Sequence, residues 1–337
     1  MRPTMHPRLV NGRFGDPALF VETMHRRQAL LFDLGDLGGL SPRDLLRISH
    51  VFVTHMHMDH FVGFDALLRV SVGREKTIHV TGPRGICDRV FHKLHGYEWD
   101  LAERYATDLV FDVREIGDDG PLRAARFRLK RRFTWEEERT DEAAVRSIDD
   151  RFQLHWALLE HHGPSLGYAV SERAHANVWK SKLDERGLPT GPWLEGLRQA
   201  VLADAADDHP VPLPDATEAP LGELRDIVTI SRGQKVAYVT DVADTPQNRT
   251  AIAALAKEAD LFFIESRFAA EDAHHARDRA HLTTTAAGEI ARAARVRKLE
   301  PFHFSPRYAG EEQRMLDEVL GAFGALVPDN AEAIAAR

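Results

Sequence analysis

The chain has 337 residues, of which 43% are hydrophobic and 28% charged, and its formal net charge of −8 gives a sequence pI near 6.1. This composition is typical of a soluble globular protein. It excludes a protein that coats nucleic acid with a broad basic face, although a local basic groove stays compatible with it. The N-terminus has no apolar stretch of signal-peptide length and no later segment approaches a membrane span, so we expect a cytoplasmic protein without membrane contact.

In the first half of the chain, short apolar runs end in polar residues, as expected of strands that are buried on both faces. Helices are expected at 59–72, directly after the second strand, and at 85–99. The charged stretch 135–151 is expected to be an exposed hairpin tip or loop. The predicted strands cover residues 29–36, 48–55, 77–85, 108–116, 123–133, 152–161 and 166–172.

After residue 172 the pattern changes. Residues 174–222 contain two helical pieces, a Gly/Pro break and a Pro/Asp-rich tail, which predicts an inserted helical arm. Strands are then expected at 234–241, 260–266 and 298–305, alternating with helices at 247–259 and 283–295 and followed by a helix at 311–327. This order predicts one layered α/β domain over residues 1–337, without repeats.

Cysteine and histidine counts bear on the chemistry. Cys87 is the only cysteine, which excludes an intramolecular disulfide and a thiolate zinc cage and favours a cytoplasmic location. Because Cys87 follows a strand-like run, we expect it to be a small core residue and not a nucleophile. Histidine is unusually frequent, with 18 residues, so their positions matter most.

The strongest motif is the segment His55-Met-His57-Met-Asp59-His60 at the end of the second strand. Two histidines two residues apart in extended backbone point the same way, so both imidazoles can face one ion. Asp59 and His60 fall where the chain turns into the helix and can reach a second ion. Neutral imidazoles and a carboxylate are the ligands of catalytic zinc sites, which keep a position open for water.

This segment, THMHMDH behind the strand VFVT, resembles the signature of the metallo-β-lactamase superfamily. The resemblance implies a four-layered αββα sandwich and three further ligands, each at a later strand end. The candidates are His161 or His162, Asp241 or Asp244, and His303. His161 is preferred because its spacing to the following PSLGY resembles the family's motif, and Asp241 is preferred because it directly ends the strand VAYVT.

The resemblance implies two zinc ions, with Mn²⁺ or Fe as alternatives. One ion would be held by His55, His57 and His161. Asp59, His60 and His303 would hold the other, and Asp241 would bridge them. Two such ions can share a hydroxide nucleophile and clamp both oxygens of a displacement at phosphorus. Asp33 either orients a ligand imidazole or caps a turn.

Four segments resemble ribonuclease Z, the tRNA 3′-end endonuclease family: EHHGPSLGY, ESRF, AHLTTTAAGEIARAARVRKL and HFSPRY. In this pattern His281 faces the metals without binding them and protonates the leaving oxygen or stabilises charge on the phosphoryl oxygens; otherwise it only precedes a helix capped by Thr283 or Thr284. Asp59 would also orient or deprotonate the attacking water, and Arg307 would touch a phosphate. The resemblance also implies a homodimer.

The element GLPTGPW resembles the arm with which ribonuclease Z grips the tRNA body, yet between Ser171 and Pro212 acidic residues outnumber basic ones. An acidic arm grips RNA poorly because phosphate neutralisation dominates affinity. The run at 123–132 could supply the charge instead, since as a strand it places Arg126, Arg128 and Lys130 on one face. The alternative for this run is a solvated edge strand.

The leading hypothesis is therefore a dinuclear zinc phosphodiesterase that cleaves precursor tRNA. The alternative is a hydrolase of a small phosphodiester or other ester, for which a closed apolar pocket would speak; a basic groove would favour the RNA substrate. A third hypothesis is a non-catalytic protein with structural or sensory metals. The open ligand set and His281 argue against it, because structural zinc sites are closed and cysteine-rich.

Overall fold

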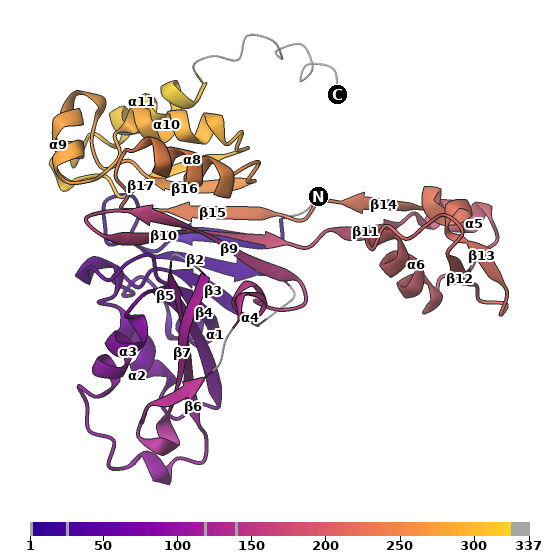
Figure 1. The fold of residues 1–337 in the computed structure, drawn as a ribbon, viewed down its shortest axis with the longest axis horizontal. Helices are drawn as coiled ribbons and strands as arrows, with labels where there is room; N and C mark the ends of the chain where they lie inside the picture. Colours follow the sequence, from indigo (N-terminus) through magenta and orange to yellow (C-terminus); the bar gives the residue numbers. More distant parts are fainter. Residues whose placement is uncertain (1–2, 25–26, 118–119, 139–140, 325–337) are drawn as a thin grey trace. The chain divides into compact units, whose positions relative to one another are not determined.

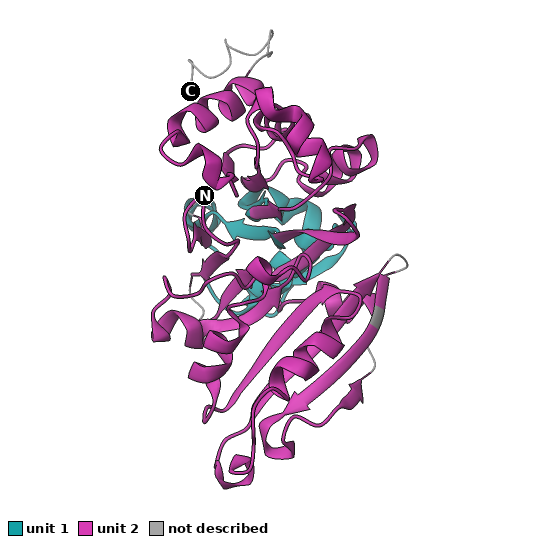
Figure 2. Cartoon of the chain, turned by 90° about the vertical axis from the view of Figure 1, so that its left-hand side faces the viewer, with its two compact units in different colours: residues 1–2, 171–234 teal, residues 3–170, 235–337 magenta. Residues whose placement is uncertain are grey.

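The computed structural model describes residues 3–24, 27–117, 120–138 and 141–324. The chain forms two compact units, shown in Figure 2. Unit 1 comprises Ser171–Gln234, and unit 2 comprises the described residues before Ser171 and after Gln234. The predicted arm at 174–222 lies inside unit 1. That the whole chain acts as a single domain stays a prediction.

Unit 2 contains an eight-stranded sheet with its strands in sequence order. Strand β3 is buried at all four positions and β4 at four of five, as predicted from their apolar runs. The strands β3, β4, β5 and β6 are mutually parallel, which brings their carboxyl ends to one edge. The strands are β1 (Met5–Leu9), β2 (Leu19–Thr23), β3 (Ala29–Phe32), β4 (Ile48–Phe52), β5 (Lys76–Pro83), β6 (Leu109–Gly117), β7 (Gly120–Arg128) and β8 (Glu136–Glu138).

A second sheet of unit 2 has five strands in the order β17-β16-β15-β10-β9. Its strands β15, β16 and β17 are mutually parallel, so their carboxyl ends also share one edge. The strands are β9 (Phe152–Glu160), β10 (Pro164–Glu172), β15 (Lys235–Val239), β16 (Leu261–Glu265) and β17 (Leu299–Phe302). Helices connect the three parallel strands, because a connection between parallel strands must be long enough to return the chain to the same end of the sheet.

Helices cover both outer faces, so unit 2 has four layers (Figure 1). The α-helices of unit 2 are α1 (Pro42–Arg47), α2 (Phe64–Ser71), α3 (Ile86–Leu94), α4 (Glu142–Arg146), α8 (Pro246–Leu255), α9 (Ala273–Asp278), α10 (Thr284–Ala293) and α11 (Glu312–Gly324). Short 3₁₀ turns are η1 (Met58–His60), η2 (Ala102–Arg104), η3 (Leu129–Arg131), η5 (Ala270–Asp272) and η6 (Pro306–Tyr308). Among the described residues, no helix has the length and apolar character needed to span a membrane.

Three hydrophobic clusters join these layers. One packs α1–α3 on the eight-stranded sheet and includes Phe64, Val90 and Phe111. A second fills the space between the sheets with side chains such as Phe32 and Tyr168, and a third packs α8 and α10 on the five-stranded sheet. Cys87 is a buried free cysteine in the first of these clusters, as expected of a small core residue. The αββα arrangement predicted from the motif is confirmed.

Two predicted elements were placed wrongly. The helix expected from residue 59 begins at Phe64, because Asp59 and His60 lie in the 3₁₀ turn η1. The stretch 135–151 is not only loop: β8 pairs with β7, and α4 begins behind the cap Asp141, whose side chain accepts a hydrogen bond from the Ala144 amide. Its high charge misled the prediction, since an edge strand and a surface helix are as well solvated as a loop.

The basic run at 123–132 is not a solvated edge strand. Strand β7 pairs with β6 on one side and β8 on the other, and Lys130 lies beyond its end in η3. Arg126 forms ion pairs with Asp112 and Glu138, and Arg128 pairs with Asp108. These acidic partners neutralise much of the charge that the sequence suggested for RNA binding.

Unit 1 has its own apolar core, which includes Leu183, Leu197, Val211 and Ile227. The sequence predicted a helical arm, but two small antiparallel sheets accompany the helices of this unit. Its elements are β11 (His175–Val178), α5 (Lys180–Glu185), α6 (Trp193–Leu202), β12 (Pro210–Pro212), β13 (Glu218–Pro220), α7 (Leu221–Leu224), η4 (Arg225–Ile227) and β14 (Val228–Ser231).

Candidate metal centre

The polar residues of the candidate site lie just beyond the ends of strands of unit 2. His161 follows β9, Asp241 lies two residues after β15, and His303 follows β17. The segment from His55 to His60 follows β4. Because ligands in α/β proteins bind beyond the carboxyl ends of parallel strands, this edge is where a site is expected.

Three residues at these strand ends have left-handed backbone. The φ angles of Asp33, Asp241 and His303 are 57°, 48° and 59°. Residues with a Cβ rarely adopt this conformation, and such strain gathers at functional sites that the surrounding structure holds in place. The three side chains are also buried. The fold therefore holds them in orientations that relaxed strand ends would not give.

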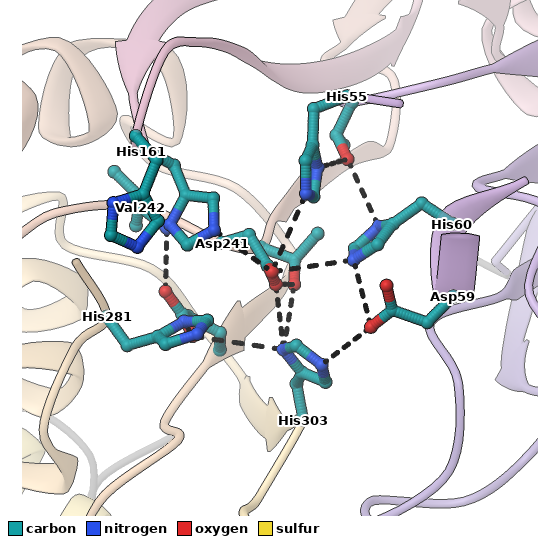
Figure 3. Close-up of polar contacts among 12 residues, drawn as sticks. His55, Asp59, His60, His161, Asp241, Val242, His281 and His303 are labelled. Carbon is teal, nitrogen blue, oxygen red and sulfur yellow. Dashed lines mark hydrogen bonds and ion pairs between the residues drawn. The ribbon is translucent and has the colours of Figure 1, made fainter. Parts of the chain in front are cut away.

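His55, His57, His161 and Asp241 form the first group, with their potential ligand atoms within 4.8 Å of one another. Asp241 Oδ2 lies 3.7 Å from His55 Nε2 and 3.6 Å from His161 Nε2. His161 Nδ1 bonds to the carbonyl oxygen of Ala280 at 2.8 Å, which fixes its ring with Nε2 toward the group. Figure 3 shows Asp241 at the centre of the surrounding imidazoles.

Asp59, His60 and His303 form the second group, again within 4.8 Å. Asp59 Oδ2 lies 3.7 Å from His60 Nε2 and 3.8 Å from His303 Nε2. Asp241 reaches this group too, since its Oδ2 is 3.5 Å from His60 Nε2 and its Oδ1 is 2.8 Å from His303 Nδ1. The Asp241 carboxylate thus lies between the two groups.

The donor set fits metal ions. Among the described residues, no hydrogen-bond partner reaches the buried Nε2 atoms of His55 and His60. Buried polar atoms are rarely left unsatisfied. The distances of 3.5–3.7 Å from Asp241 Oδ2 to three imidazole nitrogens are too long for hydrogen bonds. They are close to the separation of about 3.4 Å between ligand atoms around a tetrahedral zinc ion.

The electrostatics of the group also favour bound cations. Burial, followed by the neighbouring His60 ring, lowers the pKa of His55 to about 2, so this ring is a neutral donor. Burial acts to lower the pKa of His60, but the carboxylates of Asp241 and Asp33 outweigh it and raise that pKa to about 10. The same carboxylates that stabilise a proton on His60 would stabilise a metal ion in its place.

Asp33 contacts a histidine of the second group, which decides between the two roles open to it. Its Oδ2 lies 3.0 Å from His60 Nδ1 and accepts a 3.0 Å hydrogen bond from the Tyr238 hydroxyl. Its Oδ1 accepts a 2.7 Å bond from the Thr54 amide. A carboxylate on the Nδ1 side of an imidazole orients the ring and presents Nε2 to an ion.

His281 lies beside the groups and bonds to Glu265, a residue that the sequence analysis did not single out. His281 Nδ1 lies 2.8 Å from Glu265 Oε2, and the rings of His281 and His161 have centroids 4.8 Å apart. Burial acts to raise the pKa of Glu265, but the charge and hydrogen bond of His281 outweigh it and hold that pKa at about 2. Glu265 could have been found, because it ends an apolar strand as Asp241 does.

Two arginines near the site have contacts that were not predicted from the sequence. Arg267, which follows Glu265 by two residues, donates from Nη1 to His303 Nε2 at 2.5 Å. Arg307 bonds to Asp272 at 3.2 Å with its guanidinium 5.4 Å from the Phe268 ring centre. The contact of Arg307 with a phosphate stays a prediction.

The structure also separates the alternatives at two positions. His162 Nε2 bonds to the Arg279 carbonyl oxygen, and the side chain is exposed, whereas His161 is buried in the first group. Asp244 pairs with Arg249, whereas Asp241 lies between the groups. In each pair, the residue preferred from the sequence, His161 or Asp241, is the one that lies among the candidate metal ligands.

Known proteins resemble this chain over most of its length. No protein-family model matches it. Ribonuclease Z of Deinococcus radiodurans is 29% identical over 304 residues, which are 89% of this chain and 88% of that protein. Ribonuclease Z of Picosynechococcus sp. is 30% identical over 314 residues, or 90% of this chain and 84% of the relative. This chain belongs to the ribonuclease Z family.

Solved structures agree on the fold of this ribonuclease Z family member. Human tRNase Z, short form, has a TM-score of 0.51 and 18% identity, covering 90% of this chain and 92% of that one. A metallo-β-lactamase fold protein of Bacillus subtilis has a TM-score of 0.54 and 14% identity, covering 94% and 92%. The chain has the metallo-β-lactamase fold.

Proposed function

We propose that this chain is a metal-dependent phosphodiesterase that cleaves precursor tRNA at its 3′ end. The observation that carries the proposal is the position of Asp241, whose Oδ2 lies 3.5–3.7 Å from three imidazole nitrogens. Two of them belong to the first group, in His55 and His161, and the third to His60 of the second group. Membership of the ribonuclease Z family supports the choice of substrate, since relatives of that name match nine-tenths of the chain.

The proposed ligands are the seven residues found in the two groups. One ion is held by His55, His57 and His161, and the other by Asp59, His60 and His303. Asp241 contributes to both. We propose Zn²⁺ for both, with Mn²⁺ or Fe as alternatives that the same nitrogen and oxygen donors accept. When bound, such ions supply Lewis acidity and activate water at neutral pH.

The chain's own residues position the reactants and move the proton. Asp59 orients the attacking water, and its pKa is held below its ordinary value: burial acts to raise it, but the nearby rings of His303 and His60 outweigh that effect. His281, with Nδ1 on Glu265, presents Nε2 to the leaving oxygen and protonates it. The Glu265 carboxylate stabilises the positive charge of the imidazole before that transfer.

A smaller substrate is the second candidate, because one observation favours it. Acidic residues outnumber basic ones between Ser171 and Pro212, which disfavours this segment as a grip on RNA. On that hypothesis the site hydrolyses a small phosphodiester or other ester and does not act on tRNA. The homodimer and the cytoplasmic location expected from the sequence stay predictions.

A side-by-side assay separates the candidates. Precursor tRNA with a 3′ trailer and bis-p-nitrophenyl phosphate are each incubated with the protein and added zinc or manganese. Cleavage after the discriminator base supports the tRNA substrate. Turnover of the small diester alone contradicts it and directs the search to smaller phosphodiesters, whereas no turnover of either compound contradicts both candidates.

A further inference from the structure

A pocket of about 520 Å³ lies beside the first metal group in unit 2. Its floor is apolar and comes from Met56, Met58, Phe61 and Val62. His57 lines the same pocket and belongs to the first group as well. His57 therefore connects the first metal group to this pocket, so a molecule that reacts at the metal group can extend into the pocket.

Two side chains of this floor are unusually exposed. The side chain of Met58, between His57 and Asp59, is 80% exposed, and that of Val62 is 42% exposed. Apolar side chains placed together on a surface next to a site mark contact with a ligand. Methionine is flexible and polarisable and packs well on the face of an aromatic ring. The floor therefore suits a flat ring system that enters from solvent.

Basic side chains of α3 also line the pocket. Arg89 and Lys93, which form its cationic wall, lie four residues apart on one face of this helix, and His92 lies beside them. Lys93 Nζ pairs with Asp65 Oδ2 at 2.7 Å, and Arg89 Nη1 donates to the Gly85 carbonyl oxygen at 3.2 Å. Both contacts are at the surface, where water competes and a phosphate can replace or extend them. Guanidinium and ammonium groups are the usual protein partners of phosphate.

We propose that this pocket binds the nucleoside next to the scissile phosphate, with its base on Met58 and Val62 and a neighbouring phosphate against Arg89 and Lys93. The inference rests on the proposed function. The volume lies in the range of pockets that hold a molecule of this size. An apolar ester group would match the floor but not the cationic wall, whereas a nucleotide matches both.

The test couples a change in the pocket to a change in the RNA. Val62→Asp is assayed with intact precursor tRNA and with precursors that are abasic at the nucleotide on the 5′ or the 3′ side of the scissile phosphate. We expect Val62→Asp to lower kcat/KM about tenfold on intact RNA, in line with the stacking of one base. On one of the abasic precursors the same substitution changes kcat/KM by less than about twofold, because the base is already missing.

The metal content of the variant is measured as well. If Val62→Asp loses metal, the same three precursors are assayed with Val62→Ser, which removes apolar surface without adding charge.

A second substitution tests the cationic wall. Arg89→Ala raises KM for the intact precursor about tenfold, while the matched control Arg84→Ala, at an exposed arginine outside the pocket lining, leaves KM unchanged. Equal losses on intact and both abasic precursors overturn the pocket assignment alone. Failure of the wild type to cleave intact precursor overturns the proposed function and this assignment with it.

Discussion

In unit 2 the carboxylates of Asp33, Asp241 and Glu265 lie buried beside a cluster of histidines. In unit 1 the arginine ion pairs, such as Arg186 with Asp226, lie at the surface, and the buried carboxylate of Glu172 pairs with the partly exposed His175. Burying a carboxylate is costly unless a positive charge or hydrogen bonds compensate it. An exposed ion pair contributes little to stability and is easily replaced. The difference indicates that the charges of unit 2 are retained for a ligand.

The largest effect is expected at the carboxylate shared by the two groups. Asp241→Asn lowers precursor cleavage by about a thousandfold or more, because it weakens both proposed metal positions and each 1.36 kcal/mol of lost stabilisation is tenfold in rate. Metal analysis shows less than two ions per chain, and circular dichroism shows the fold retained. The control is Asp244→Asn, a surface carboxylate paired with Arg249. Equal loss in both variants contradicts the assignment of Asp241.

A smaller loss is expected at the proposed proton donor. His281→Ala lowers kcat about a hundredfold, the usual range for general acid catalysis, and leaves the metal content unchanged. His162→Ala is the matched control, since this exposed histidine bonds to the Arg279 carbonyl oxygen instead of Glu265. Loss of metal in His281→Ala shows that the residue is a ligand and overturns the role proposed for it.

A substitution of Asp33 tests whether its buried carboxylate strengthens metal binding by His60. Asp33→Asn removes the charge that faces His60 Nδ1, and we expect zinc affinity to fall about thirtyfold, within the range for groups that orient a metal ligand. Competition with a chromophoric chelator measures this change. Unchanged affinity, with the thermal midpoint lowered, would mean that Asp33 only supports the fold.

Arg267 is expected to have the opposite effect. Its guanidinium bonds to the nitrogen of His303 that faces the second group, so it opposes a cation there. Arg267→Gln should therefore raise zinc affinity about tenfold, as expected for removing one charge a few ångströms from a dication. Zinc titration with the same chelator measures it. Weaker binding in this variant shows that Arg267 orients His303 instead of opposing the ion.

The smallest effect is expected in unit 1. Arg186→Ala removes a surface ion pair with Asp226, so the free energy of unfolding falls by no more than about 1 kcal/mol and precursor cleavage changes less than twofold. Urea unfolding and the cleavage assay measure the two quantities. A tenfold loss of cleavage with unchanged stability contradicts the comparison, because it means that this surface binds RNA.

Much of the site could be predicted because its proposed ligands follow strands that can be recognised in the sequence as apolar runs. His55, His57, Asp59 and His60 stand in one segment, and His161, Asp241 and His303 each follow a predicted strand. Contacts between side chains far apart in sequence could not be predicted in the same way. The bond between Arg267 and His303 depends on how two loops pack, and Asp272, which pairs with Arg307, lies on a turn that carries no motif.

The fold was predictable because its main strands are apolar runs. The prediction failed where a segment is highly charged and shows no hydrophobic periodicity. Strand β3 is apolar throughout and β4 at three of its five positions, and both were predicted, whereas β8, the three-residue strand Glu136–Glu138, has no apolar face by which it could be recognised. Unit 1 was expected to be helical because its helices carry apolar residues at helical spacing. Its short strands, rich in proline, lack the alternation that identifies a strand.

The most direct test of the account is cleavage of a precursor tRNA with a 3′ trailer by the wild-type protein, before and after dialysis against a chelator and again after zinc is returned. We expect a single cut at the 3′ end of the tRNA, its loss on chelation and its recovery with about two zinc ions per chain. Cleavage that persists in the dialysed, metal-free protein would contradict the claim that the buried carboxylates and histidines of unit 2 act through bound metal.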